Sequence, residues 1–156
     1  MSAGDVRVRR AEPVDAAELA RLLHDFNTEF SSPTPGVAAL TTRTEELIAS
    51  GEITVLLAGD GPDGLAVLRL RPALWSEGLD AHLEELYVVP ALRGKGIGRA
   101  LLERAMEVAR EAGAVRIDLG TEETDTVARA LYESCGFTNR ESAPDGPLMF
   151  FYERDL

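Results

Sequence analysis

The chain has 156 residues, 45% hydrophobic and 28% charged, which predicts a single soluble globular domain over residues 1–156. Its 16 basic and 27 acidic residues give a net charge of −11, which argues against general nucleic-acid binding because that requires a basic surface. The single cysteine, Cys135, excludes an internal disulfide and a cysteine metal cluster. Since we find no signal peptide and no apolar run of about 18 residues, we expect a cytoplasmic protein.

The N-terminal half predicts a mixture of strands and helices. Alternation indicates a first strand over 6–9, and Asp15 with Glu18 three residues later is typical of a capping box that starts a helix. Thr42 and Glu45 predict a second box, for a helix over 42–50. Two antiparallel strands, 53–58 and 65–70, follow around the turn 59–64. The expected core face of the first helix is Leu19, Leu22, Leu23, Phe26 and Phe30.

The C-terminal half continues the alternation. We expect strands over 82–89 and 115–119, a long helix over 96–112, and a helix over 126–135 closed by Gly136. The expected buried face of the long helix is Leu101, Leu102, Ala105, Met106 and Ala109. Further strands are expected from Phe137 and over 148–153. Helices interspersed among paired strands predict an α/β fold with a mixed sheet.

The glycine-rich stretch 93–99, R-G-K-G-I-G-R, is the most informative segment. It lies between the apolar run 86–90 and the helical pattern that starts near Ala100. Glycines allow backbone amides to approach an anion closely, and a helix N-terminus directs its unpaired N–H groups at that anion. Three basic residues at a helix start oppose the helix dipole, so this stretch is expected to hold an anion.

Three phosphate-loop motifs can be compared with this stretch. A P-loop requires lysine after its second glycine, whereas Lys95 precedes Gly96. The dinucleotide motif G-x-G-x-x-G/A fails in both registers, which place Arg99 or Leu101 at its last position. The pattern that fits is R-x-x-G-x-G, carried by Arg93, Gly96 and Gly98 after L-Y-V-V-P.

On these residues the chain resembles the GNAT superfamily of acyl-CoA N-acyltransferases. A second motif, residues 128–137, is similar to the family's A-x-x-L-Y-x-x-x-G-F segment. The resemblance implies a mixed α+β sheet of six to seven mostly antiparallel strands, splayed between the fourth and fifth, with about four helices. It also implies acetyl-CoA as co-substrate, without a metal.

The resemblance assigns the co-substrate to the loop and to the strand before it. Amides of Gly94, Lys95, Gly96, Ile97, Gly98 and Arg99, with Arg93, would hold the pyrophosphate. Backbone groups of Leu86, Tyr87 and Val88 would pair with the pantetheine arm at a bulged strand, and the Val88 N–H would polarise the thioester carbonyl. Asp125 stands where the family commonly has an asparagine that contacts the co-substrate; we favour it as a helix N-cap.

Tyr132 is the expected general acid, because a phenol near the sulfur can protonate the leaving thiolate. The general base stays open among Glu85, Glu84 and His82, in that order, and a water chain. Neighbouring strand residues face opposite sides, so Glu84 and Glu85 cannot both point inward unless a bulge intervenes. Cys135, at a helix C-terminus, is expected to be a packed thiol rather than a nucleophile, which favours direct attack by the amine.

The expected function is transfer of an acetyl group from acetyl-CoA to a primary amine of a small molecule. Alternatives are a protein lysine or N-terminal acetyltransferase and a catalytically silent CoA-binding sensor. The resemblance also implies a homodimer, and it places Trp75 and the segment 33–40 beside the acceptor.

Overall fold

The computed structural model describes residues 5–156 and divides the chain into two compact units. The first unit ends at Leu119, and the second runs from Gly120 to Leu156. No helix of residues 5–156 is long and apolar enough to cross a membrane. A single domain over residues 1–156 stays a prediction.

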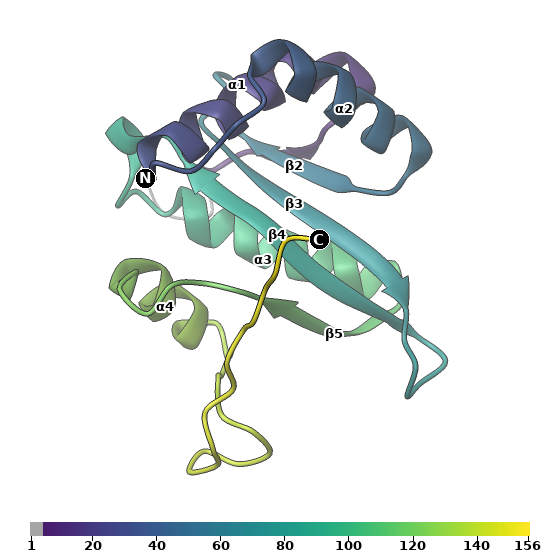
Figure 1. Cartoon of the computed structure of the whole chain (residues 1–156), viewed down its shortest axis with the longest axis vertical. Coiled ribbons are helices and arrows are strands. Elements are labelled where there is room, and N and C mark those ends of the chain that lie inside the picture. Colours follow the sequence, from purple (N-terminus) through teal and green to yellow (C-terminus); the bar gives the residue numbers. More distant parts are fainter. Residues whose placement is uncertain (1–4) are drawn as a thin grey trace. The chain divides into compact units, whose positions relative to one another are not determined.

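A five-stranded sheet forms the centre of the first unit (Figure 1). Its strands are β1 (Val8–Arg10), β2 (Thr54–Ala58), β3 (Gly64–Pro72), β4 (Leu79–Val88) and β5 (Ala114–Leu119). Their spatial order follows the chain, and every pairing is antiparallel except that of β4 with β5. The mixed, mostly antiparallel sheet is confirmed, with five strands in the described residues rather than six to seven.

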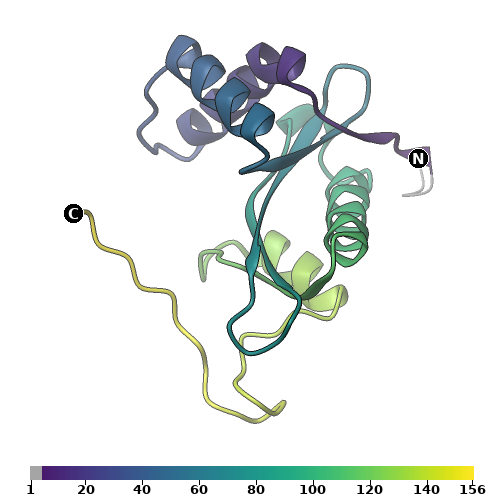
Figure 2. The same cartoon turned by 90° about the vertical axis from the view of Figure 1, so that its right-hand side faces the viewer.

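Helices cover both faces of this sheet, as Figure 2 shows. Helices α1 (Ala16–Glu29) and α2 (Val37–Ser50) lie on one face, and α3 (Ile97–Glu111) lies on the other. Two short 3-10 turns, η2 (Pro13–Asp15) and η3 (Pro90–Leu92), precede α1 and the glycine loop. The buried face of α3 is confirmed for Leu101, Leu102, Ala105 and Ala109, whereas Met106 is only partly buried and Val108 is buried instead.

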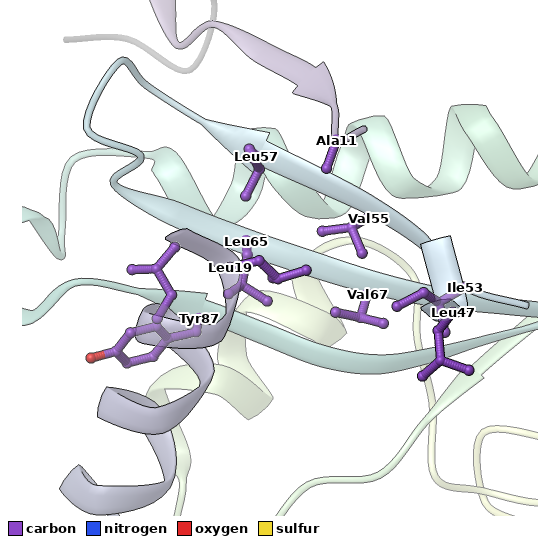
Figure 3. Close-up of a cluster of buried hydrophobic side chains, with 10 residues drawn as sticks. Ala11, Leu19, Leu47, Ile53, Val55, Leu57, Leu65, Val67 and Tyr87 are labelled. Carbon is purple, nitrogen blue, oxygen red and sulfur yellow. The ribbon is translucent and has the colours of Figure 1, made fainter. Parts of the chain in front are cut away.

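The core between the sheet and the α1–α2 pair is almost entirely aliphatic (Figure 3). Leu19 and Leu22 are fully buried, as their helical spacing predicts, and Leu23 and Phe26 pack at the edge of the cluster. Each buried leucine contributes roughly 1.5–3 kcal/mol by leaving water. Phe30 is 53% exposed, so its assignment to the core face was wrong; it follows the last residue of α1.

Two helix starts differ from the prediction. The Asp15 carboxylate does not cap α1; it accepts from the Glu12 N–H at 2.8 Å and from Arg9, so the capping box closes η2 instead. Helix α2 begins at Val37 rather than Thr42, because Gly36 adopts a φ of 95° and caps the turn there. A glycine adopts this φ angle with little conformational strain. The Thr42 pattern on which the prediction was based gives no information about this earlier start.

The second unit contains α4 (Thr126–Ser134) followed by turns and an extended tail. Gly136, with φ 90°, ends the helix as predicted. The strands expected from Phe137 and over 148–153 are not formed: one isolated bridge joins Arg140 to Leu148, and residues 149–156 have no regular structure. A strand requires a ladder partner, and the turn-rich segment 139–147 provides only that bridge.

Candidate active site

Strand β4 extends beyond its neighbour β5. The parallel ladder runs from Leu79–Ala114 to Leu83–Leu119 and stops there, whereas β4 continues to Val88 in pairing with β3. The expected splay between the fourth and fifth strands is therefore present within the first unit. On the β5 side, residues 84–88 of β4 have no strand partner in the described sheet; the backbone groups of Leu86 and Val88 point to this side, whereas those of Tyr87 point to Leu65 of β3.

A bulge at Glu84 lies at the point where the strands part. Val67 pairs with Glu85 and the next residue, Leu68, pairs with Leu83, so Glu84 is the extra residue. Directly opposed residues share a face, which places Glu85 beside Val67 on the α1–α2 side. Glu84 reaches Arg69 of the same face, at 2.7 Å from its Nε. The bulge thus brings both glutamates to one face of the sheet. The sequence analysis had given such a bulge as the condition under which both could point inward.

The two glutamates have different electrostatic surroundings. Glu84 is half-exposed and ion-paired with Arg69. The pKa of Glu85 is raised to about 7, chiefly by burial and then by the Glu84 charge, against an opposing effect of His82. A carboxyl that titrates near neutral pH is suited to accept and release protons.

His82 and Asp118 face each other across the β4–β5 junction. They are register partners in the parallel ladder, one rung before its end, and Nδ1 of His82 lies 2.5 Å from Oδ1 of Asp118. The side chains are 36% and 44% exposed. His82 also opposes Arg69, two residues from Val67, and therefore lies on the same face as Glu85. We refer to Arg69, His82, Glu84, Glu85 and Asp118 as the β4 cluster.

Asp118 was not among the residues that the sequence singled out. It lies 36 positions from His82, and its role depends on the register of two parallel strands. An aspartate on an otherwise apolar strand pattern, I-D-L, was the available signal.

The glycine loop has the backbone of an anion site. Gly94 and Gly96 have φ angles of 77° and 86°, in the left-handed region. Gly96 caps α3 without a side-chain hydrogen bond, and the first turn contains no acidic residue. The Ala100 N–H donates to Gly96 O, and the N–H groups of the first helical residues, Ile97 and Gly98, are directed along the helix axis toward the loop. Lys95 is exposed beside them.

The Arg93 side chain forms hydrogen bonds within the protein. Its guanidinium donates twice to Glu29, at 2.7 and 2.8 Å, and its Nε donates to the Val88 carbonyl at 2.9 Å. It also lies 5.4 Å from the centre of the Tyr87 ring, and the buried Tyr87 hydroxyl donates to Glu29 at 3.2 Å. Through these bonds Arg93 ties the loop to the end of α1 and to β4.

Three further residues that the sequence singled out lie in the second unit. Asp125 caps α4, accepting from the Ala128 N–H at 3.1 Å, as we favoured. Tyr132 lies in the last turn of α4, with its ring 6.0 Å from that of Phe137. Cys135 follows the helix as its C-cap residue. In the first unit, Trp75 is 94% exposed in the β3–β4 turn.

Comparison with known proteins identifies a family. Residues 17–137 match the model of the Acetyltransferase (GNAT) family, which covers the sheet from β2 onward, the glycine loop and α4. A crystal structure of a protein from Arthrobacter sp. FB24, assigned as an acetyltransferase, superposes with a TM-score of 0.88 at 47% identity over 96% of both chains.

Two curated relatives have named acceptors. An aminoglycoside N(6')-acetyltransferase of Stenotrophomonas maltophilia is 32% identical over 90% of this chain and 92% of its own length. A mycothiol acetyltransferase of Beutenbergia cavernae is 33% identical over 86% of this chain. This chain spans 46% of that relative, about half its length.

Proposed function

The chain belongs to the Acetyltransferase (GNAT) family of acetyl-CoA-dependent N-acetyltransferases, and from this premise we propose that it acetylates a primary amine of a small cationic molecule. The observation that carries the proposal is the β4 cluster: three carboxylates, a histidine and an arginine at the point where β4 and β5 part. Strand β4, which contributes three of its residues, is followed by η3 and then by the glycine loop at the start of α3.

The residues of the loop fit a pyrophosphate-bearing co-substrate. Left-handed backbone at Gly94 and Gly96, an uncapped helix start and the absence of acid in the first turn of α3 all favour a bound anion. Acetyl-CoA supplies the acetyl thioester. The N–H groups of residues 94–99 would hold its phosphates, and the β4 segment from Leu86 to Val88, which extends beyond β5, would align its arm, with the Val88 N–H toward the thioester carbonyl.

Glu85 is the proposed general base. Its pKa of about 7 allows it to accept a proton from an ammonium near neutral pH, whereas Glu84 is engaged by Arg69. The amine nitrogen then forms the new C–N bond as the C–S bond breaks. Of the two protons that the ammonium loses, one passes to Glu85 and on to water, and one reaches the departing sulfur by way of the Tyr132 hydroxyl.

The acidic face supports a cationic acceptor. The β4 cluster contributes three carboxylates, those of Glu84, Glu85 and Asp118, and the whole chain has a charge of −11, so a cation is attracted to this face. The relatives named for an aminoglycoside and for mycothiol are consistent with a small acceptor.

The test is release of CoA thiol from acetyl-CoA with a panel of aminoglycosides, amino sugars and polyamines, compared with lysine-bearing and N-terminal peptides. We expect turnover with small polyamines or amino sugars. Turnover restricted to peptides would favour the protein acetyltransferase instead, and tight CoA binding without turnover on any amine would favour a CoA-binding sensor.

We also propose a homodimer formed through the C-terminal segment. Phe150, Phe151 and Tyr152 are 72%, 74% and 87% exposed, and in residues 5–156 no backbone hydrogen bond is recorded beyond Met149. Consecutive exposed aromatic side chains of this kind mark an interaction site. Light scattering should give twice the chain mass for the wild type and a monomer for Phe150→Ser/Phe151→Ser.

A cytoplasmic location, where acetyl-CoA is available, completes the proposal, and cell fractionation tests it.

A further inference from the structure

In the hydrogen bond between His82 and Asp118, the histidine is the donor. A carboxylate accepts hydrogen bonds but does not donate them, so a bond from Nδ1 to Oδ1 requires the proton on Nδ1. A neutral imidazole carries one N–H, and its other nitrogen, Nε2, is then an acceptor. The 2.5 Å contact therefore selects one of the two tautomers of His82.

The surroundings of His82 are those of the β4 cluster. Glu84 and Glu85 face it from its own strand, Arg69 opposes it from β3, and Asp118 opposes it from β5. Arg69 is paired with Glu84 at 2.7 Å, which leaves Glu85 and the His82 ring as the groups that an ammonium on this face would meet.

A deprotonated amine has requirements that a carboxylate base alone does not meet. It carries one lone pair, which must point at the thioester carbon, and two N–H groups, each of which orients the nitrogen if it donates to a fixed acceptor. Glu85 can accept one of these bonds. An imidazole nitrogen with an unshared pair, held rigidly on the same face, can accept the other.

We infer that Asp118 is a positioning residue that holds His82 in the Nδ1–H tautomer, so that Nε2 accepts a hydrogen bond from the acceptor amine during acetyl transfer. The inference deepens the proposed function and rests on it. It assigns to Asp118 an effect that is exerted entirely through His82, and this property separates it from a residue that merely supports the β4–β5 junction.

The tautomer can be observed without any activity. The chain has two histidines, so His24→Gln, which alters a residue of α1, leaves His82 as the single imidazole in long-range proton–nitrogen NMR spectra. We expect the Nδ1–H pattern in this protein and its loss in the additional Asp118→Ala variant. Asp80→Ala, which removes a carboxylate two residues before His82, is the matched control and should leave the pattern unchanged. A predominant Nε2–H form with Asp118 present would overturn the inference.

Kinetics test whether the effect passes through His82. Asp118→Ala should lower kcat by about 10- to 100-fold, as loss of an oriented contact does, with little change in the KM for acetyl-CoA. In a His82→Ala background the same substitution should change kcat less than about twofold. Asp118→Glu, which keeps the carboxylate, should recover part of the loss. Additive losses, or an unchanged kcat in Asp118→Ala, would overturn the role of Asp118.

Two further outcomes keep the readings separate. If Asp118→Ala does not fold, Asp118→Asn, which keeps the shape of the side chain, takes its place in the same cycle. If the Nδ1–H tautomer is present but no amine is acetylated, the proposed function fails, and the role of Nε2 fails with it, whereas the tautomer assignment stands on the spectra alone.

Discussion

Arg93 and Glu29 form a two-pronged ion pair, with N–O distances of 2.7 and 2.8 Å, between the glycine loop and the end of α1. The pair joins residues 64 positions apart in the sequence. Arg93 holds the pKa of the Glu29 carboxyl below its ordinary value, and burial raises that of the neighbouring Tyr87 phenol. The first arginine of the R-x-x-G-x-G motif is therefore engaged with the protein itself.

We predict from this geometry that Arg93 affects co-substrate binding indirectly, because it holds the glycine loop in place. Arg93→Ala and Glu29→Ala should each raise the KM for acetyl-CoA by about 3- to 10-fold, corresponding to roughly 1 kcal/mol for a half-exposed pair. The double variant should be no worse than either single one. Arg104→Ala, which removes the ion pairs with Glu107 and Glu111 within α3, is the control. A much larger effect of Arg93→Ala, steeply dependent on salt, would instead indicate direct phosphate binding.

Gly94 predicts a second test of the loop. Its φ of 77° lies in the left-handed region, while a Cβ added there would meet nothing within 4 Å. Gly94→Ala should therefore cost about 1–2 kcal/mol through backbone strain alone, and weaken CoA binding by calorimetry as the loop shifts. Gly94→Asn should cost less, since asparagine tolerates this conformation. Gly120→Ala, at an equally open position without positive φ, should have no effect.

The features predictable from the sequence are those encoded by local patterns. The glycine loop, the start of α3 beside Gly96 and the Asp125 cap follow from residues a few positions apart. Each needs only its own segment of chain to form. The long helix and the positions of the five strands along the chain follow from periodicity for the same reason.

The features that sequence reasoning missed depend on pairing between distant segments. The bulge at Glu84 exists only relative to Val67 and Leu68 on β3, and it decides which face both glutamates occupy. The contact of Asp118 with His82 depends on the β4–β5 register. The strand expected over 148–153 had a suitable composition but no partner in its own unit, and composition alone cannot provide one.

We predict that loss of the Tyr132 hydroxyl lowers the rate of the chemical step and leaves co-substrate binding unchanged. Tyr132→Phe removes the hydroxyl but keeps the ring that packs near Phe137. If the phenol protonates the leaving thiolate, kcat should fall by about 100-fold or more, with the KM for acetyl-CoA nearly unchanged. Phe137→Leu, which disturbs the same packing without removing the hydroxyl, is the matched variant for steady-state kinetics. Unchanged turnover in Tyr132→Phe would exclude the acid role.

Glu85 predicts the pH dependence of the rate. A base must be ionised to act, so kcat/KM should rise with pH through a midpoint near 7, the pKa of Glu85. Glu85→Gln should remove this limb and lower kcat by about 100-fold or more. Glu84→Gln removes a neighbouring negative charge that raises this pKa, so it should move the midpoint to lower pH while retaining most of the activity. A limb that persists in Glu85→Gln would assign the base elsewhere in the β4 cluster.

We predict that the Glu85 carboxyl lowers the free energy of unfolding at high pH. Because its pKa is raised from 4.5 to about 7, the folded chain binds this proton more tightly than the unfolded chain between those values. Its contribution therefore favours folding below about pH 4.5 and is lost as the pH rises through 7. Glu85→Gln, which cannot ionise, should exceed the wild type in unfolding free energy by about 1–2 kcal/mol at pH 8 and by much less at pH 5. Denaturant titrations at both pH values provide the measurement, with Glu103→Gln, an exposed carboxyl of α3, as the control. A difference that is equal at pH 5 and pH 8 would mean that Glu85 is not held near neutrality by the fold.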